Sequence, residues 1–210
     1  MTQTSTALAA TEKERPTRRA LVGLAVVILV FFVGMLATGH DISYDTKTAD
    51  IKDAYDTSET AARIGSYAGM VLVALMLFFG SALRNALRAS GKTWFADPVF
   101  LGFGALAATF ASWDVTDAAM WKAVDSGNEG VIRTIATISD AGFLPLMASM
   151  IALYVGAGLA GLATGALPRW LAIASIVIGV LAPLGPLGFI GFTLLPLWII
   201  AVASWVRLEV

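Results

Sequence analysis

Apolar segments long enough to cross a bilayer recur along this chain and restrict its fold more than any other feature. A helix needs about 20 mainly apolar residues to span the hydrocarbon core. The 210 residues are 58% hydrophobic and 14% charged, whereas soluble domains carry about 25% charged residues. The apolar runs are continuous rather than alternating, which disfavours a β-barrel. The sequence therefore predicts an all-α integral membrane protein.

The apolar runs also predict the domain organisation. Residues 1–17 are polar and are expected to form a disordered cytoplasmic tail, and 18–207 a single membrane domain. Its six spans are expected at about 20–38, 64–83, 98–120, 140–165, 170–184 and 187–205. Pro145 should kink the fourth span, because proline lacks a backbone donor. For the last two spans a re-entrant hairpin that does not fully cross is the alternative.

The positions of the basic residues predict the orientation, since cytoplasmic loops of membrane proteins are rich in Lys and Arg. With the N-terminus inside, nine of the 14 Lys and Arg residues fall in cytoplasmic segments and five outside. Of the 15 acidic residues, eleven fall outside. The six-helix bundle is therefore expected to have both termini in the cytoplasm. A short surface helix over 48–55 is expected in the acidic loop after the first span.

Two motifs carry a family resemblance. The turn before the last two spans reads Gly165-Ala166-Leu167-Pro168-Arg169-Trp170-Leu171, and the basic loop after the second span reads Leu83-Arg84-Asn85-Ala86-Leu87-Arg88. In these motifs, and in its pattern of helices, the chain resembles a broad group of uncharacterised bacterial multi-pass membrane proteins. The resemblance implies a six-helix bundle in the bacterial cytoplasmic (inner) membrane. It implies no known activity and transfers no functional residue.

Polar residues gather where the third span ends and the fourth begins. Residues three or four apart share a helix face, so Asp114, Asp117 and Trp121 lie together, with Trp113 beside them. On the next helix Arg133, Thr137 and Asp140 share a face. Counting back from the connecting loop places Asp117 opposite Arg133 and Asp114 opposite Asp140. We expect an ion pair from the first match and two carboxylates sharing one proton from the second.

This constellation has two interpretations. In the first, the residues are hydrated in the outer headgroup region and the tryptophans are interfacial anchors. In the second, they form a cavity open to the outside. In a cavity Asp114, Asp117 and Asp140 are the candidate acid groups. The candidate binding residues there are Trp113, Trp121, Arg133 and Thr137. His40, the one histidine, is expected to be interfacial.

The function classes follow from what the chain contains. The first is a non-enzymatic membrane protein, transporter-like or an accessory subunit. The alternative is a membrane-embedded enzyme that uses an aspartic acid on a lipid-soluble substrate, as an isoprenoid cyclase would, and a purely structural protein is the third. With no cysteine and one histidine, no metal site or cofactor is expected. The expected partners are the lipid bilayer, a lipid-soluble small molecule, and further copies or a larger membrane complex, but not nucleic acid.

Overall fold

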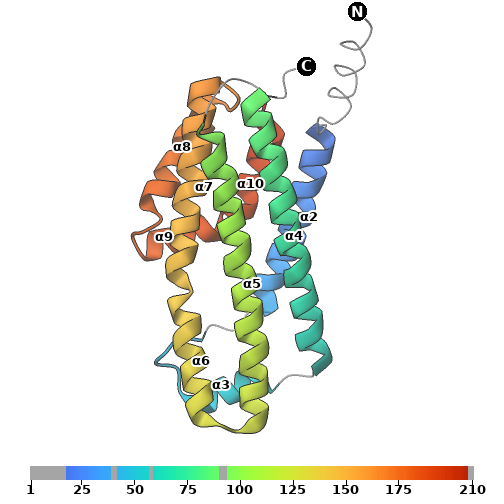
Figure 1. Cartoon of the computed structure of the whole chain (residues 1–210), viewed down its shortest axis with the longest axis vertical. Coiled ribbons are helices and arrows are strands. Elements are labelled where there is room, and N and C mark those ends of the chain that lie inside the picture. Colours follow the sequence, from blue (N-terminus) through green and yellow to red (C-terminus); the bar gives the residue numbers. More distant parts are fainter. Residues whose placement is uncertain (1–17, 39–41, 57–58, 90–93, 208–210) are drawn as a thin grey trace, which may run out of the picture.

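The computed structural model describes residues 18–38, 42–56, 59–89 and 94–207, and the regular structure in this part of the chain is helical, with no strand. The helices are α2 Arg18–Thr38, α3 Thr48–Tyr55, α4 Glu59–Ala89, α5 Ala96–Ser126, α6 Glu129–Ala141, α7 Phe143–Thr164, α8 Arg169–Leu181, α9 Pro186–Thr193 and α10 Leu195–Trp205. Figure 1 shows an elongated bundle in which the long helices run side by side. The short helix over 48–55 is confirmed as α3.

Four described helical segments are long and apolar enough to cross a membrane. They are Arg18–Ala37, Ile64–Ala89, Ala96–Ser126 and Glu129–Thr164, the last comprising α6 and α7. They correspond to the first four predicted spans, and they support the prediction of a helical membrane protein. Helices α4 and α5 have 31 residues each, or about 46 Å. Since a hydrocarbon core is about 30 Å thick, both helices extend beyond it.

The fourth span is interrupted at Gly142, between α6 and α7. Pro145, the third residue of α7, follows three residues later. A proline cannot donate to the carbonyl four residues before it, here that of Ala141, and its ring crowds that carbonyl. The interruption therefore lies where the predicted effect of Pro145 falls. At Gly142 the indole of Trp113 occupies the space of a side chain: its Nε1 lies 2.5 Å from where a Cβ would be.

The C-terminal helices form a hairpin rather than two straight spans. Helix α8 has 13 residues, and α9 and α10 are bent by 50° relative to each other. The segment of the expected span over 187–205 is divided into α9 and α10, which together are long and apolar enough to cross a membrane as one bent span. Pro196 sits at the start of α10, where its ring would clash with the preceding turn of a continuous helix. The amide of Arg207 donates to the Ala166 carbonyl at 2.8 Å. The end of α10 thus returns to the start of α8.

Buried hydrogen bonds attach this hairpin to the long helices. The Trp198 indole N–H donates to Ser175 Oγ at 2.8 Å, which joins α10 to α8. The Tyr154 hydroxyl of α7 donates to the Gly191 carbonyl of α9 at 2.9 Å. The rings of Tyr154 and Trp198 also meet edge to face, 4.7 Å apart. Polar groups away from water need such partners, so these contacts set how the hairpin packs.

Two separate hydrophobic cores lie along the bundle. The large one runs through α2, α4, α5, α7, α8, α9 and α10 and includes Phe32, Phe79 and Phe103. The small one joins α3, the last turns of α5, and α6; its buried members are Ile51, Tyr55, Met120, Ala123, Ile132 and Ala136. We call α3, α6 and the last turns of α5 the small subdomain, which lies at the lower end of Figure 1.

Charges separate to the two ends of the bundle. The upper end of Figure 1 holds the start of α2, the end of α4, the start of α5 and α8, and the end of α10. The described charged residues there are Arg18, Arg19, Arg84, Arg88, Asp97, Arg169 and Arg207. The small subdomain end is acidic, and Lys52 of α3 pairs there with Glu129 of α6 at 3.6 Å. The expected alternation of basic and acidic loops is thus present at the two ends.

Candidate functional site

A hydrogen bond between α3 and α5 organises the acidic end. The ring of Tyr55, the last residue of α3, is 7% exposed in the small core. Its hydroxyl donates to Oδ1 of Asp117 on α5. Burial raises the pKa of Tyr55 above its ordinary value, and the bond to Asp117 and the negative charge of that carboxylate raise it further. Tyr55 therefore stays a hydrogen-bond donor well into the alkaline range.

Asp114, one turn earlier on α5, points toward a different neighbour. The nearest atoms to a Cβ built on Gly69 of α4 are the two carboxylate oxygens of Asp114, at 2.2 and 2.3 Å. Only a glycine at position 69 gives the carboxylate this space. Oδ2 of Asp114 is buried and has no hydrogen-bond partner in the described part of the chain. Buried polar atoms without a partner are rare and call for an explanation.

Trp113 closes the large core where it meets the small subdomain. Its ring lies 5.8 Å from that of Phe110 and 6.1 Å from that of Phe192, measured between centroids. On its other side the indole nitrogen packs on Gly142. Trp113 and Asp114 therefore diverge: the indole faces the α6–α7 break and α9, and the carboxylate faces α4. The cavity hypothesis requires both side chains to line one cavity, and in the structure they do not.

The structure also separates the two pairs that depth counting matched. Arg133 donates from Nη1 to the backbone carbonyls of Tyr44 and Thr46, at 3.2 and 2.6 Å. The predicted Asp117–Arg133 ion pair is therefore wrong, because loop carbonyls bind the guanidinium. Asp140 is exposed on α6, while Asp114 is directed at α4. Counting residues from the loop had placed Asp140 opposite Asp114, but a contact between the two carboxylates explains neither position.

The remaining predicted residues have structural contacts. Trp121 packs partly buried against the small core. The Thr137 hydroxyl donates to the Arg133 carbonyl at 3.0 Å, within its own helix. His40 lies outside the described residues. Among those described, no three His, Asp or Glu side chains are grouped so that they could hold a metal ion.

Sequence reasoning missed the residues that contact the two aspartates. Tyr55 was expected only as the end of a surface helix, and Gly69 only as part of the second span. A signal for Gly69 was present: Gly65 and Gly69 form a Gly-x-x-x-Gly pair, a pattern that allows another helix to approach closely. Nothing in the sequence indicates that the approaching group is a carboxylate.

The site can be described chemically from these contacts. Two carboxylates one helical turn apart lie where the apolar bundle meets the small subdomain. Asp117 accepts a hydrogen bond from the buried phenol of Tyr55, and Asp114 has a buried oxygen without a hydrogen-bond partner among the described residues. Such an arrangement can take up a proton or a small cation. No protein family, curated protein or solved structure matches the chain.

Proposed function

We propose that the protein is a non-enzymatic, multi-pass membrane protein, transporter-like or an accessory subunit of a larger membrane assembly, with a proton- or cation-binding site at Asp114. The observation that carries the proposal is the buried Oδ2 of Asp114, which no described protein group satisfies. An ionisable group at such a depth is costly unless it is used. A proton or a small cation would supply the missing partner.

The placement of the site supports the same proposal. Asp114 stands between the large core and the small subdomain, so an ion reaching it from the acidic end need not cross the bundle. Because Gly69 has no side chain, the carboxylate of Asp114 fits against α4. The acidic residues of the small subdomain also favour cations near its surface. These features belong together in an ion-binding membrane protein.

No contact favours the enzyme alternative. A general acid that generates a carbocation needs an aromatic face beside the reacting carbon to stabilise the positive charge. Trp113 is turned away from Asp114 toward Phe110 and Phe192. Asp117 is bonded to Tyr55, and Asp140 is exposed on another helix. The three candidate acids thus do not converge on one substrate position.

The proposal includes the orientation and the location. We place the chain in a bacterial cytoplasmic membrane, with the arginine-rich end in the cytoplasm and the small subdomain outside. The basic composition of the one end supports this. The helices α8 to α10 then enter from the cytoplasmic side and return to it, and the chain starts and ends there. The bilayer, further copies or a larger complex are the proposed partners.

Infrared difference spectroscopy between acid and neutral pH tests the site. The wild-type protein in lipid nanodiscs should show a protonated-carboxyl band that persists near neutral pH, where exposed carboxyls are ionised, and Asp114→Asn should remove that band. Asp140→Asn is the matched control, since it makes the same change at an exposed carboxyl, and it should keep the band. Sodium and potassium titrations followed by thermal stability test the cation alternative. If neither a band nor a cation effect depends on Asp114, the proposal fails.

A second measurement separates the two roles. In liposomes with an imposed pH gradient, a transporter-like protein should move protons or cations in a way that Asp114→Asn abolishes. An accessory subunit should show the Asp114-dependent binding without flux.

A further inference from the structure

The carboxyl group of Asp114 lies against the bare backbone of α4. A Cβ built on Gly69 would overlap with both oxygens and the carbon of that group. One turn away on the same helix, a Cβ on Gly65 would meet nothing described within 4 Å. The close approach is therefore specific to Gly69. The surface that this glycine presents to the carboxyl group consists of C–H groups and supplies no oxygen ligand.

A metal cation beside Asp114 would lack ligands. Calcium takes about six to eight oxygen ligands, and cation sites inside membrane proteins commonly use the carbonyls of unwound helices. Both α4 and α5 are unbroken at this level. The other carboxylate within one turn, Asp117, is bonded to Tyr55 through Oδ1. Among the described residues no three His, Asp or Glu side chains are grouped for a metal ion.

A proton needs none of these ligands. Burial away from water disfavours the charged form of a carboxyl group, and a proton removes the charge without any further contact. The buried Oδ2 of Asp114, which has no hydrogen-bond partner among the described residues, is the atom that can carry it. The contacts of this carboxyl group thus suit a proton better than a metal cation.

The charged groups around the site leave room for that proton. Helices α7 and α9 contain no acidic or basic residue, and α2 contains none beyond Arg19. On α4, Tyr67 is exposed. On α6, Arg133 is bound to loop carbonyls and Asp140 is exposed. The described charge closest along α5 is the negative one of Asp117, which favours a proton at its neighbour.

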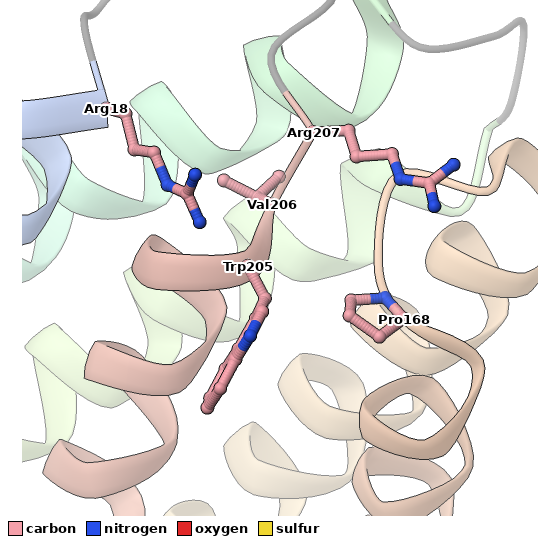
Figure 2. A pocket seen from close by; sticks show the side chains of 5 residues that line it. All are labelled: Arg18, Pro168, Trp205, Val206 and Arg207. Atoms are coloured by element: carbon pink, nitrogen blue, oxygen red, sulfur yellow. The ribbon is translucent and has the colours of Figure 1, made fainter.

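The proton is expected to reach Asp114 from the small subdomain. Helix α5 runs from Ala96 to Ser126, and Asp114 lies nearer to Ser126, at the small subdomain end. At the opposite end the structure has a hollow lined by Arg18, Pro168, Trp205, Val206 and Arg207. Figure 2 shows its two arginines on opposite sides of Val206. This lining has no acidic residue that would attract a cation.

We propose that the ligand of the Asp114 site is a proton and not a metal cation, and that Gly69 is the positioning residue that makes this selection. The assignment rests on the proposed function. Asp114 takes the proton from water at the small subdomain and returns it there, so that one O–H bond forms or breaks at its carboxyl group. Gly69 acts through Asp114, because it holds the carboxyl group against a surface that offers no further oxygen.

Gly69→Ala, with Gly65→Ala as the matched control, tests the positioning. A methyl group at position 69 displaces the carboxyl group from α4 toward water, where carboxyls are ionised at neutral pH. In nanodiscs at neutral pH the protonated-carboxyl infrared band, identified by its shift in deuterium oxide, should be lost in Gly69→Ala and kept in Gly65→Ala. A merely structural role would lower thermal stability and leave the band in place.

Three results would overturn the role of Gly69. They are a band in Gly69→Ala equal to that of the wild type, an equal loss of the band in both glycine variants, and a Gly69→Ala protein that does not fold. The last would assign the glycine to packing alone.

The wild-type protein tests the ligand. Sodium, potassium and calcium chlorides are added at neutral pH, with choline chloride as the control for ionic strength. The band should persist, and no salt should stabilise the wild type more than Asp114→Asn. A cation that abolishes the band, or that stabilises only the wild type when no band is present, identifies a metal site; the Asp114 site then stands, and its assignment to a proton is wrong. The absence of both a band and an Asp114-dependent cation effect is the separate result that removes the proposed function.

Discussion

Replacing Tyr55 with phenylalanine removes one hydroxyl and little else. The ring is buried in the small core, and phenylalanine keeps its packing, so the change removes the hydroxyl that donates to Asp117. Hydrogen bonds to charged groups contribute about 1.5–3 kcal/mol when buried. Asp117 is exposed, so water can replace part of the lost bond. We therefore expect about 1–1.5 kcal/mol of lost docking energy for α3.

Amide hydrogen exchange of α3 is the suitable assay, since a short helix opens locally rather than with the whole bundle. The loss corresponds to roughly fivefold to thirteenfold faster exchange of the α3 amides. The raised pKa of Tyr55 fixes the pH dependence. The bond contributes fully below the ordinary tyrosine pKa of about 10 and is lost only as pH rises through the raised value. The difference between wild type and variant should therefore be constant across neutral pH.

The control and the refutation use the same assay. Tyr44→Phe removes the hydroxyl of an exposed tyrosine in the neighbouring loop, and it should leave α3 exchange unchanged. Asp117→Ala combined with Tyr55→Phe should cost less than the sum of the two single changes, because both remove the same bond. Additive effects, or α3 exchange equal to the wild type in Tyr55→Phe, would show that this bond does not dock α3.

Three further outcomes are expected. Single cysteines at Ser126 and Arg169 should label from opposite sides of intact cells with an impermeant reagent, Ser126 from outside; external labelling of Arg169→Cys would reverse the proposed orientation. Gly102→Ala should lower the thermal stability of the purified protein by about 1–3 kcal/mol, because a Cβ there would lie 2.6 Å from a backbone nitrogen of α7. Gly104→Ala, where nothing lies within 4 Å, should be neutral or stabilising, and equal losses in both would refute the close contact. Arg133→Gln should speed proteolysis of the loop 42–47, whose carbonyls the guanidinium binds, and an unchanged cleavage rate would show that the loop is held by other contacts.

Sequence patterns predicted which segments are helical and at which end of the bundle their charges lie. Length and hydropathy decide those features: α2 begins at Arg18 and α3 spans 48–55, within two residues of the expected bounds. The same patterns could not predict the direction in which a side chain points around its helix axis. Counting from a loop gives the height of Asp117 and Arg133, but not which neighbouring helix each side chain faces.

The position of the helix breaks was predictable only in part. Pro196 interrupts the last apolar run and could have indicated the bend before α10. Pro145 likewise indicated the break at Gly142, because a proline disrupts the turn that precedes it, whereas the packing of Trp113 on Gly142 comes from another helix and is contained in no local pattern. The partners of Asp114 and Asp117 were unpredictable for the same reason, since α3 and α4 come to α5 through tertiary contacts.

The short hairpin of α8, α9 and α10 has a consequence for the surrounding lipid. Helix α8 rises about 20 Å over its 13 residues, less than the hydrocarbon thickness of about 30 Å. Its turn satisfies its own backbone, with the Leu184 amide bonded to the Leu181 carbonyl and the Gly188 amide to the Gly185 carbonyl, so it tolerates an apolar surrounding. In the placement we propose, with the hairpin entering from the arginine-rich end, the bilayer beside it would thin or the opposite leaflet would fill the gap. Such hydrophobic mismatch carries a small energy per ångström, and in that placement it would favour thinner membranes and give the lipid shell of the protein a thin side.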